Sequence, residues 1–378
     1  MILTEEQVLI RDTTRAFARD RLAPFAAERE AAGEIPRTVI AEMGALGLMG
    51  MTVPPEWGGA GADHVSYALA LAEVAAAHGA ISTVMSGHNS VGCQPLLRYG
   101  TAAQRARWLR PMARGEILSC FCLTEPQGGS DAAAIRTRAR REGEGWRLDG
   151  VKQFITSGAI ADLALVFALT DPEAGKRGIS AFLVPTATPG YVVTRRERKM
   201  GQNASDTCEI RFEALRLGPE ALLGREGQGY RIALANLEGG RIGIAAQCLG
   251  MARAALDRAV AYARARVTFG KRIIDHQAVG FRLAEMATRL AAAEQLVLHA
   301  AALASAGQPC LKEASMAKLF ASEMAERVCS DAIQTFGGAG YLAEQEVERI
   351  YRDVRGAKIY EGTNDIQLLV IARALDRE

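Results

Sequence analysis

The chain has 378 residues, of which 49% are hydrophobic, so it is long enough for two or three domains with sizeable cores. Its 45 lysine and arginine residues nearly balance 43 aspartate and glutamate residues, and this balance argues against a dedicated nucleic-acid binder. No apolar run reaches the length of a membrane span and the N-terminus resembles no signal or transit peptide, so we expect a cytoplasmic protein without a membrane partner.

The first third of the chain carries helical patterns. Residues 5–27 form an alanine-rich amphipathic pattern, residues 67–77 a run of small side chains suited to close packing, and residues 88–99 a buried helix. The segment PPEWGGAG at residues 54–61 is a loop by its turn residues. We therefore predict an N-terminal helical domain over residues 1–118.

A β-rich middle part begins near Ser119. Its short runs of strand-forming residues are bounded by Gly, Pro and Asp, and the first run ends in a turn. These runs are residues 146–151, 163–169, 179–184, 191–194 and 208–212. Their spacing predicts a small antiparallel, barrel-like β domain over residues 119–225.

Helical patterns return after the β-rich part and continue to the end of the chain. Three of them are long, at residues 232–265, 281–304 and 311–336. Long apolar helices in succession are typical of an antiparallel four-helix bundle, which we predict over residues 226–378. The whole chain is thus predicted to be an α+β multi-domain protein in the order helical, β, helical.

The cysteines and histidines predict no metal site. The seven cysteines are scattered and odd in number, which indicates free thiols in a reducing compartment. Cys120 and Cys122 form a C-x-C pair, but no second pair lies nearby, and the five histidines lack ligand spacing.

The run IYEGTND at residues 359–365 contains a candidate base. Glu361 stands between an aromatic residue and a glycine, and Thr363 can cap a helix whose apolar residues recur at helical spacing. A turn at a helix N-terminus leaves backbone N–H groups free for an anion or an oxygen. The alternative is a surface glutamate before a terminal helix, and these residues alone leave both interpretations open.

Two further clusters lie in the β-rich part. The segment FCLTEPQGGSD at residues 121–131 places hydroxyls, glycines and an acid in one loop, where the backbone can approach a flat or phosphorylated ligand. The segment KQFITSG at residues 152–158 offers an aromatic ring and a hydroxyl on one strand face. Taken singly, they also suit an ordinary glycine-rich connection and a plain strand edge.

Together and in this order, the clusters resemble the acyl-CoA dehydrogenase family over essentially the whole chain. The resemblance also rests on the segments LEGGRIG at 237–243, RVTFGK at 266–271, DHQ at 275–277 and QTFGGAGY at 334–341. It implies the family fold and bound FAD. No G-x-G-x-x-G follows a predicted strand, so a Rossmann-type flavin site is not indicated.

The resemblance implies where FAD would lie. Thr124 matches the residue that bonds the isoalloxazine ring, and the loop with Phe121, Leu123, Gly129 and Ser130 runs along that ring. Phe154 matches the aromatic residue beside the ring, with Ile155 next to it, and Thr156 matches the hydroxyl that faces N5. Thr363 and Asp365 match positions near the ribityl and pyrophosphate groups. A last set matches positions that reach a flavin across a subunit interface: Arg266, Phe269, Gln277, Gln334, Gly337 and Gly338.

The resemblance also implies a reaction, in which an acyl-CoA thioester becomes the trans-2-enoyl-CoA. Glu361 matches the base that removes the α-proton, while the β-hydrogen leaves as hydride to flavin N5. The backbone N–H of Glu361 and a ribityl hydroxyl would stabilise the developing enolate. Desolvation would raise the pKa of Glu361 above the usual ~4.3. Tyr360 would wall the pocket, and Gly362 would leave room for the thioester.

A rival position for the base lies on the first bundle helix. Isovaleryl- and long-chain-type members carry their glutamate at the position that matches Gly240, so that arrangement is absent here. Glu238 matches an acidic position on the CoA side instead. Gly239, Gly240 and Arg241 on the same helix are expected to bind the substrate, with Arg241 and Ser130 at its pantetheine end.

The substrate and the partners are less closely determined. Ser82 stands where glutaryl-type members carry an arginine, so we expect a short or medium, straight or branched acyl-CoA rather than a dicarboxylyl one. Electrons would pass to electron-transferring flavoprotein in a homotetramer, a dimer of dimers. The alternatives are an acyl-CoA oxidase that uses oxygen and a non-catalytic flavin- or CoA-binding homologue.

Overall fold

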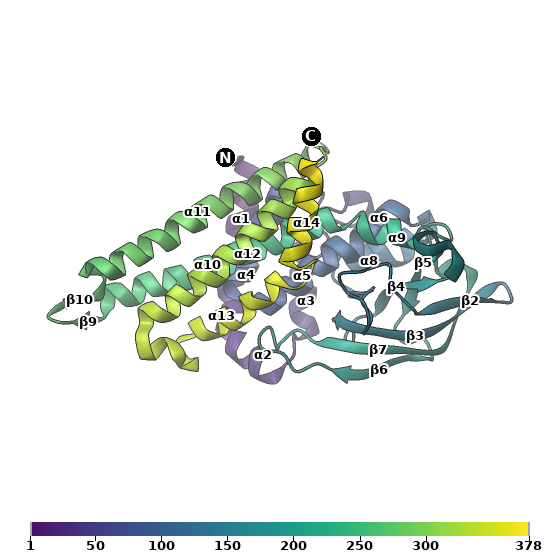
Figure 1. Cartoon of the computed structure of the whole chain (residues 1–378), viewed down its shortest axis with the longest axis horizontal. Coiled ribbons are helices and arrows are strands. Elements are labelled where there is room, and N and C mark those ends of the chain that lie inside the picture. The colour runs from purple at the N-terminus through teal and green to yellow at the C-terminus, as the bar shows by residue number, and fades with distance from the viewer. Residues whose placement is uncertain (1, 377–378) are drawn as a thin grey trace.

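A computed structural model of the chain describes residues 2–376. Long helices occupy one end of the molecule and a β-sheet the other, while the helix that ends the chain starts between them (Figure 1). The order helical, β, helical is thus the predicted one. Among the described residues, no helix combines the length and the apolar character that crossing a bilayer requires.

The first N-terminal helix is shorter than its sequence pattern, whereas the one predicted at residues 67–77 is longer. The predicted helix over residues 5–27 is α1 (Glu5–Phe17), a π-helical turn, a 3₁₀ turn and α2 (Ala26–Ala32). Pro24 lies in the 3₁₀ turn, and proline cannot donate the backbone hydrogen bond of a continuing helix. The remaining α-helices of this part are α3 (Arg37–Ala45), α4 (His64–Ala77), α5 (Gly79–Gly87), α6 (Gln94–Tyr99), α7 (Ala102–Gln104) and α8 (Arg110–Ala113). The predicted helix over residues 88–99 is a π-helical segment, His88–Cys93, that continues as α6.

The middle part is one eight-stranded sheet in the order β6-β7-β3-β2-β4-β5-β8, with β1 pairing β4. Its strands are β1 (Ser119–Cys122), β2 (Arg138–Glu142), β3 (Gly145–Thr156), β4 (Leu163–Leu169), β5 (Ile179–Pro185), β6 (Tyr191–Arg196), β7 (Thr207–Leu217) and β8 (Leu222–Leu223). Two details differ from the prediction. The described strands do not close into a barrel, and β1 runs parallel to β4.

β3 is longer than its sequence pattern. The first predicted run ends in a turn at Val151, but the strand continues to Thr156. Its register with β7 shifts between Leu148 and Gly150 and again between Lys152 and Ile155, so β-bulges absorb the turn-forming residues. Phe154 lies in the second shift with φ 58°, and its side chain is exposed.

The C-terminal part consists of long helices and one small hairpin. Its elements are α9 (Gly229–Leu234), α10 (Leu237–Ala265), β9 (Val267–Thr268), β10 (Lys271–Arg272), α11 (Gln277–Ser305), α12 (Leu311–Phe336), α13 (Val347–Arg355) and α14 (Asn364–Leu375). The predicted helix over residues 232–265 breaks before α10. The side chain of Asn236 donates to Ile232 O at 2.7 Å there, which competes with the helical ladder.

The main core joins the N-terminal and C-terminal helices. α10 packs against α4, α11 and α12, so the C-terminal helices share this core with an N-terminal helix. The small-residue helix α4 does pack closely, because a Cβ on Gly250 of α10 would lie 2.1 Å from Ala72 O. This packing positions the N-terminal end of α10 and the start of α14 near one another.

Candidate active site

Glu361 lies in a tight left-handed turn that leads into α14. Its φ is 56° and that of Gly362 is 86°. Thr363 caps the helix, as predicted, by accepting from Ile366 N at 3.3 Å. A glutamate rarely adopts positive φ, so the surroundings must hold this conformation against its intrinsic cost.

The carboxylate of Glu361 points at the backbone of α10. Although the residue is partly exposed as a whole, Oε1 is buried and has no hydrogen-bond partner among the described residues. A Cβ on Gly240 would lie 1.8 Å from Oε1, so any side chain at this position would displace the carboxylate from where it lies. Burial raises the pKa of Glu361 to about 7, while Arg241 and Lys318 oppose that rise.

Two buried cations lie on the helices around this carboxylate. Arg241 of α10 is 4% exposed and donates to Ser315 Oγ at 3.1 Å. Lys318 of α12 is fully buried, and its ammonium donates to Gly362 O at 2.8 Å. Arg241 was expected on the pantetheine side, whereas the burial of Lys318 was not predicted. No local signal marks a lysine on an amphipathic helix as buried.

A network of amides and hydroxyls holds Tyr360. Its hydroxyl donates to Gln247 Oε1 at 2.7 Å and accepts from Gln202 Nε2 at 3.0 Å. Gln247 also donates to Ser82 Oγ at 2.8 Å, and Thr83 donates to Gln202 Oε1 at 2.6 Å. This network closes the space behind Tyr360 with groups that already have partners. Sequence reasoning missed it because its members come from three distant parts of the chain.

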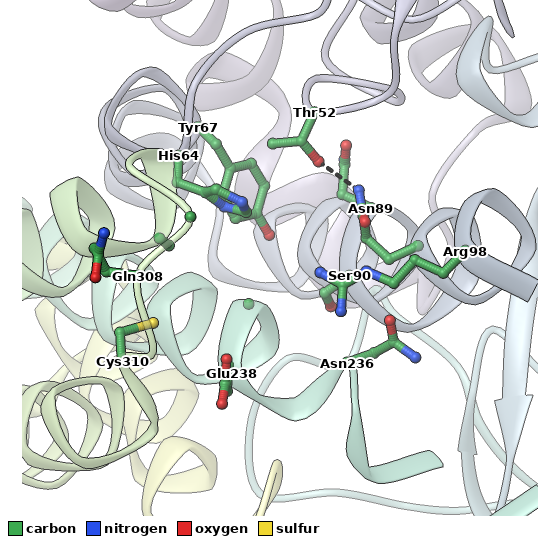
Figure 2. A pocket seen from close by; sticks show the side chains of 14 residues that line it. Thr52, His64, Tyr67, Asn89, Ser90, Arg98, Asn236, Glu238, Gln308 and Cys310 are labelled. Atoms are coloured by element: carbon green, nitrogen blue, oxygen red, sulfur yellow. Dashed lines mark hydrogen bonds between the residues drawn. The ribbon is translucent and has the colours of Figure 1, made fainter. Parts of the chain in front are cut away.

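A cavity of about 180 Å³ adjoins the N-terminal end of α10. Glu238 and Gly239 line it from α10, and Tyr67 and His64 line it from α4 (Figure 2). Asn236 is 3% exposed, and its Oδ1 has no hydrogen-bond partner within the described residues. The cavity therefore offers polar groups next to the two predicted CoA-side residues.

The loop after β1 is tied to β3. The backbone N–H of Gln153 donates to Thr124 O at 2.9 Å, which brings the two predicted flavin clusters together. The hydroxyls of Thr124 and Thr156 have no intramolecular partner among residues 2–376, and the ring of Phe154 is 60% exposed. Both segments thus present unused polar groups and an aromatic ring.

A buried ion pair lies under this loop. Lys152 Nζ is 2.7 Å from Glu125 Oε1 and also donates to Leu123 O at 3.0 Å. Glu125 accepts further bonds from the N–H groups of Arg136 and Thr137. Burial alone raises the pKa of Glu125, but the Lys152 charge and these bonds outweigh it and lower that pKa. Sequence reasoning missed the pair, since its members are 27 positions apart.

The comparisons with known proteins identify the family. Models of the acyl-CoA dehydrogenase N-terminal, middle and C-terminal domains match residues 4–116, 120–215 and 227–375. The chain belongs to the acyl-CoA dehydrogenase family. It is 48% identical to an acyl-CoA dehydrogenase of Bacillus subtilis, over 99% of each chain.

Two solved structures share the acyl-CoA dehydrogenase fold over the full length. Butyryl-CoA dehydrogenase from Megasphaera elsdenii has a TM-score of 0.97 and 40% identity, covering 100% of both chains. A chain of the structure described as electron transferring flavoprotein of Acidaminococcus fermentans has a TM-score of 0.98 and 43% identity, again with 100% of both chains covered. The predicted fold class is confirmed, and the protein is an oxidoreductase that uses FAD.

The cluster around Thr124 suits the FAD of an acyl-CoA dehydrogenase. A flat ring with polar edges needs an aromatic surface and free hydroxyls beside it, and Phe154, Thr124 and Thr156 present these groups. A Cβ on Gly129 would lie 3.6 Å from Thr124 Cγ2, which is ordinary van der Waals contact, so the loop packs Gly129 directly beside Thr124. That each of these residues contacts FAD stays a prediction.

The residues predicted to reach a flavin across the subunit interface lie far from Thr124 of the same acyl-CoA dehydrogenase chain. The stacked rings of Tyr262 and Phe336, 4.2 Å apart, join the last turns of α10 and α12. The β9–β10 hairpin extends from this end, opposite the sheet (Figure 1), and its Phe269 is 95% exposed. Within one chain, six residues therefore do not lie at the loop of residues 121–131: Arg266, Phe269, Gln277, Gln334, Gly337 and Gly338.

Proposed function

We propose that the protein converts an acyl-CoA thioester to the trans-2-enoyl-CoA with Glu361 as the base. The observation that carries this proposal is the buried, unpartnered Oε1 of Glu361 against Gly240. A carboxylate without hydrogen bonds keeps its lone pairs available for a proton. The pKa of Glu361, about 7, places its ionised form within the neutral range.

The same turn offers a donor to the developing enolate. Within the described residues, the backbone N–H of Glu361 donates to no protein acceptor. A free N–H beside the base can bind the thioester oxygen as negative charge develops there. The α-proton then moves to the Glu361 carboxylate, while Tyr360, fixed by Gln247 and Gln202, walls the pocket.

FAD, when bound, supplies the acceptor for the β-hydrogen as hydride. Thr124, Phe154 and Thr156 would hold its ring, and Thr363 and Asp365 would lie near its ribityl and pyrophosphate groups. The exposed set around Phe269 would complete the site of a second copy, as in a dimer of dimers. Arg266 suits a pyrophosphate because guanidinium groups bind phosphate oxygens in a bidentate manner.

The substrate proposed is a short acyl-CoA. Its support is the similarity to butyryl-CoA dehydrogenase and the state of Ser82, which is fully buried and bonded to Gln247. No arginine stands there for a second carboxylate. The CoA part would enter by the cavity beside Glu238 and Gly239. The electrons would pass to electron-transferring flavoprotein, as the similarity to the Acidaminococcus fermentans chain suggests.

Anaerobic mixing with a panel of acyl-CoAs tests the function. We expect straight and branched short-chain acyl-CoAs to bleach the bound flavin, and glutaryl-CoA to bleach it more slowly. If no acyl-CoA bleaches the flavin, the protein is a non-catalytic homologue. Slow reoxidation of the reduced enzyme by oxygen would support the dehydrogenase, and rapid reoxidation would favour the oxidase.

The rate should depend on the ionisation of Glu361. Because the carboxylate form is the base and its pKa is about 7, kcat/KM is expected to rise with pH through about 7. Activity is lost as the pH falls, since the protonated acid cannot accept the α-proton. Steady-state assays from pH 5 to 9 would measure the midpoint. A midpoint near the ordinary ~4.3 of a glutamate would contradict a buried base.

A further inference from the structure

Lys318 is a buried lysine whose side chain ends at the turn that carries Glu361. It lies on α12 and is fully buried. Its ammonium donates to Gly362 O at 2.8 Å and to Asn364 Oδ1 at 3.0 Å. Ser322, one turn further along α12, also donates to Asn364 Oδ1, at 3.1 Å. One helix thus binds both the turn and the first residue of α14.

These bonds hold a conformation that glutamate would not adopt by itself. Positive φ at Glu361 directs its side chain toward Gly240, and a change of φ would move the carboxylate away. Gln367 supports the same turn from the other side, donating to Gly362 O at 2.9 Å and to Glu361 O at 3.3 Å. The two carbonyls of the turn therefore face buried donors.

We propose that Lys318 is a positioning residue of the reaction, whose ammonium fixes the Glu361–Gly362 turn and supplies part of the positive field around the Glu361 carboxylate. The inference rests on the proposed function of Glu361. It assigns Lys318 two separable effects. The hydrogen bonds set where the base lies, and the charge sets how easily the base ionises.

The charges around the turn agree with this role. The charges of Arg241 and Cys248 of α10 and of Glu361 act on Lys318, and that of Glu361 acts on Tyr67 of α4. Burial lowers the pKa of Lys318 to about 8, so the ammonium is mostly charged at neutral pH. Arg241 and Lys318 are the cations that favour the ionised form of Glu361. Removing one of them should make Glu361 harder to ionise.

Two variants separate the effects. Lys318→Met removes both charge and donors, whereas Lys318→Gln keeps a donor for Gly362 O without the charge. The charge effect predicts that both variants shift the pH midpoint of flavin reduction upward by about one unit or more. The positioning effect predicts a loss of at least about 10-fold in the high-pH limiting rate for Lys318→Met, and a smaller loss for Lys318→Gln.

The measurements are made on the FAD-containing enzyme. Anaerobic single-turnover reduction by a short acyl-CoA gives the rate and its midpoint. Infrared difference titration of the substrate-free enzyme gives the ionisation of Glu361 directly, with the carboxyl band assigned by its absence in Glu361→Gln. Lys358→Met is the matched control, because Lys358 bonds to Glu326 near the same turn. It should leave both midpoints unchanged.

Unshifted midpoints in both Lys318 variants would overturn the proposal, even if their thermal stability fell. A lowered stability alone is what a purely structural lysine would produce. If wild-type flavin is not reduced by any acyl-CoA, the proposed function fails instead. The infrared midpoint would still test whether Lys318 governs the ionisation of Glu361.

Discussion

Replacing Glu361 by glutamine is expected to leave a yellow, FAD-containing protein whose flavin acyl-CoA no longer reduces. The amide has nearly the same shape, so the turn, its bonds from Gln367 and Lys318, and the Thr363 cap should persist. The amide cannot accept a proton at neutral pH. A loss on the order of 10⁴-fold in the rate of flavin reduction is expected, since no other base replaces the carboxylate.

The control for this variant is another buried glutamate. Glu73 of α4 is 4% exposed and pairs with Arg15 and Arg253, away from the turn. Glu73→Gln should therefore retain flavin reduction, although its stability can fall. Anaerobic stopped-flow absorbance of the flavin measures both variants. Near-normal reduction of Glu361→Gln would eliminate Glu361 as the base.

A relocation of the base tests the geometry further. Because a Cβ on Gly240 would lie 1.8 Å from Glu361 Oε1, side chains from the two positions compete for one volume. Gly240→Glu in a Glu361→Gly background is expected to recover at least about 10-fold in rate over Glu361→Gly alone, roughly 1.4 kcal/mol. Gly240→Glu in the wild-type background should reduce activity, because two carboxylates cannot share the space. No recovery in the double variant would mean that the two positions do not converge on the substrate.

Lys152→Met is expected to produce the largest loss of stability. Its side chain is 0% exposed and that of Glu125 2% exposed, so the substitution leaves an unpaired charge in the interior. Breaking a buried pair in this way costs about 3–5 kcal/mol in the free energy of unfolding. The loop from Leu123 to Ser130 also loses the bond from Lys152 to Leu123 O, so the FAD content of the purified protein should fall.

The double variant Lys152→Met, Glu125→Met tests whether the stability lost in Lys152→Met comes from the unpaired charge of Glu125. With both charges removed, most of the lost stability should return, although the N–H groups of Arg136 and Thr137 lose an acceptor. Urea unfolding of the single and double variants at pH 7 measures the coupling. A double variant no more stable than Lys152→Met would show that the charge imbalance is not the cause.

The pH dependence of stability tests the same ion pair. In the wild type the pKa of Glu125 is lowered. The ionised Glu125 therefore stabilises the folded protein at neutral pH, and this contribution is lost as the pH falls below a glutamate's usual range. In Lys152→Met burial dominates and raises the pKa of Glu125, so the stability deficit should shrink as the pH falls and the acid takes up a proton. A deficit that grows toward low pH would contradict this account.

Helices and strands that are specified by nearby residues could be predicted from the sequence. The limits of β4 and α12 agree with their patterns, because continuous apolar composition and helical spacing are visible within a few residues. The Thr363 cap is local too. β2 was missed because RARRE is rich in charge and carries a weak apolar signal. α13 was missed although a local signal exists, since Val347, Ile350, Tyr351 and Val354 recur at helical spacing between charged residues. β3 was cut short because bulges that tolerate Asp149-Gly150 depend on the partner strand.

The candidate site also combines features that the sequence indicates with features that depend on packing. The order and spacing of the clusters at residues 121–131, 152–158 and 359–365 already indicate which segments carry chemistry. That Glu361 faces Gly240, that Lys318 binds its turn and that Lys152 pairs with Glu125 follows only from how the elements pack. These contacts join residues far apart in the chain. The pKa of Glu361 depends on burial and on charges from α10 and α12, which exist only once the helices have packed.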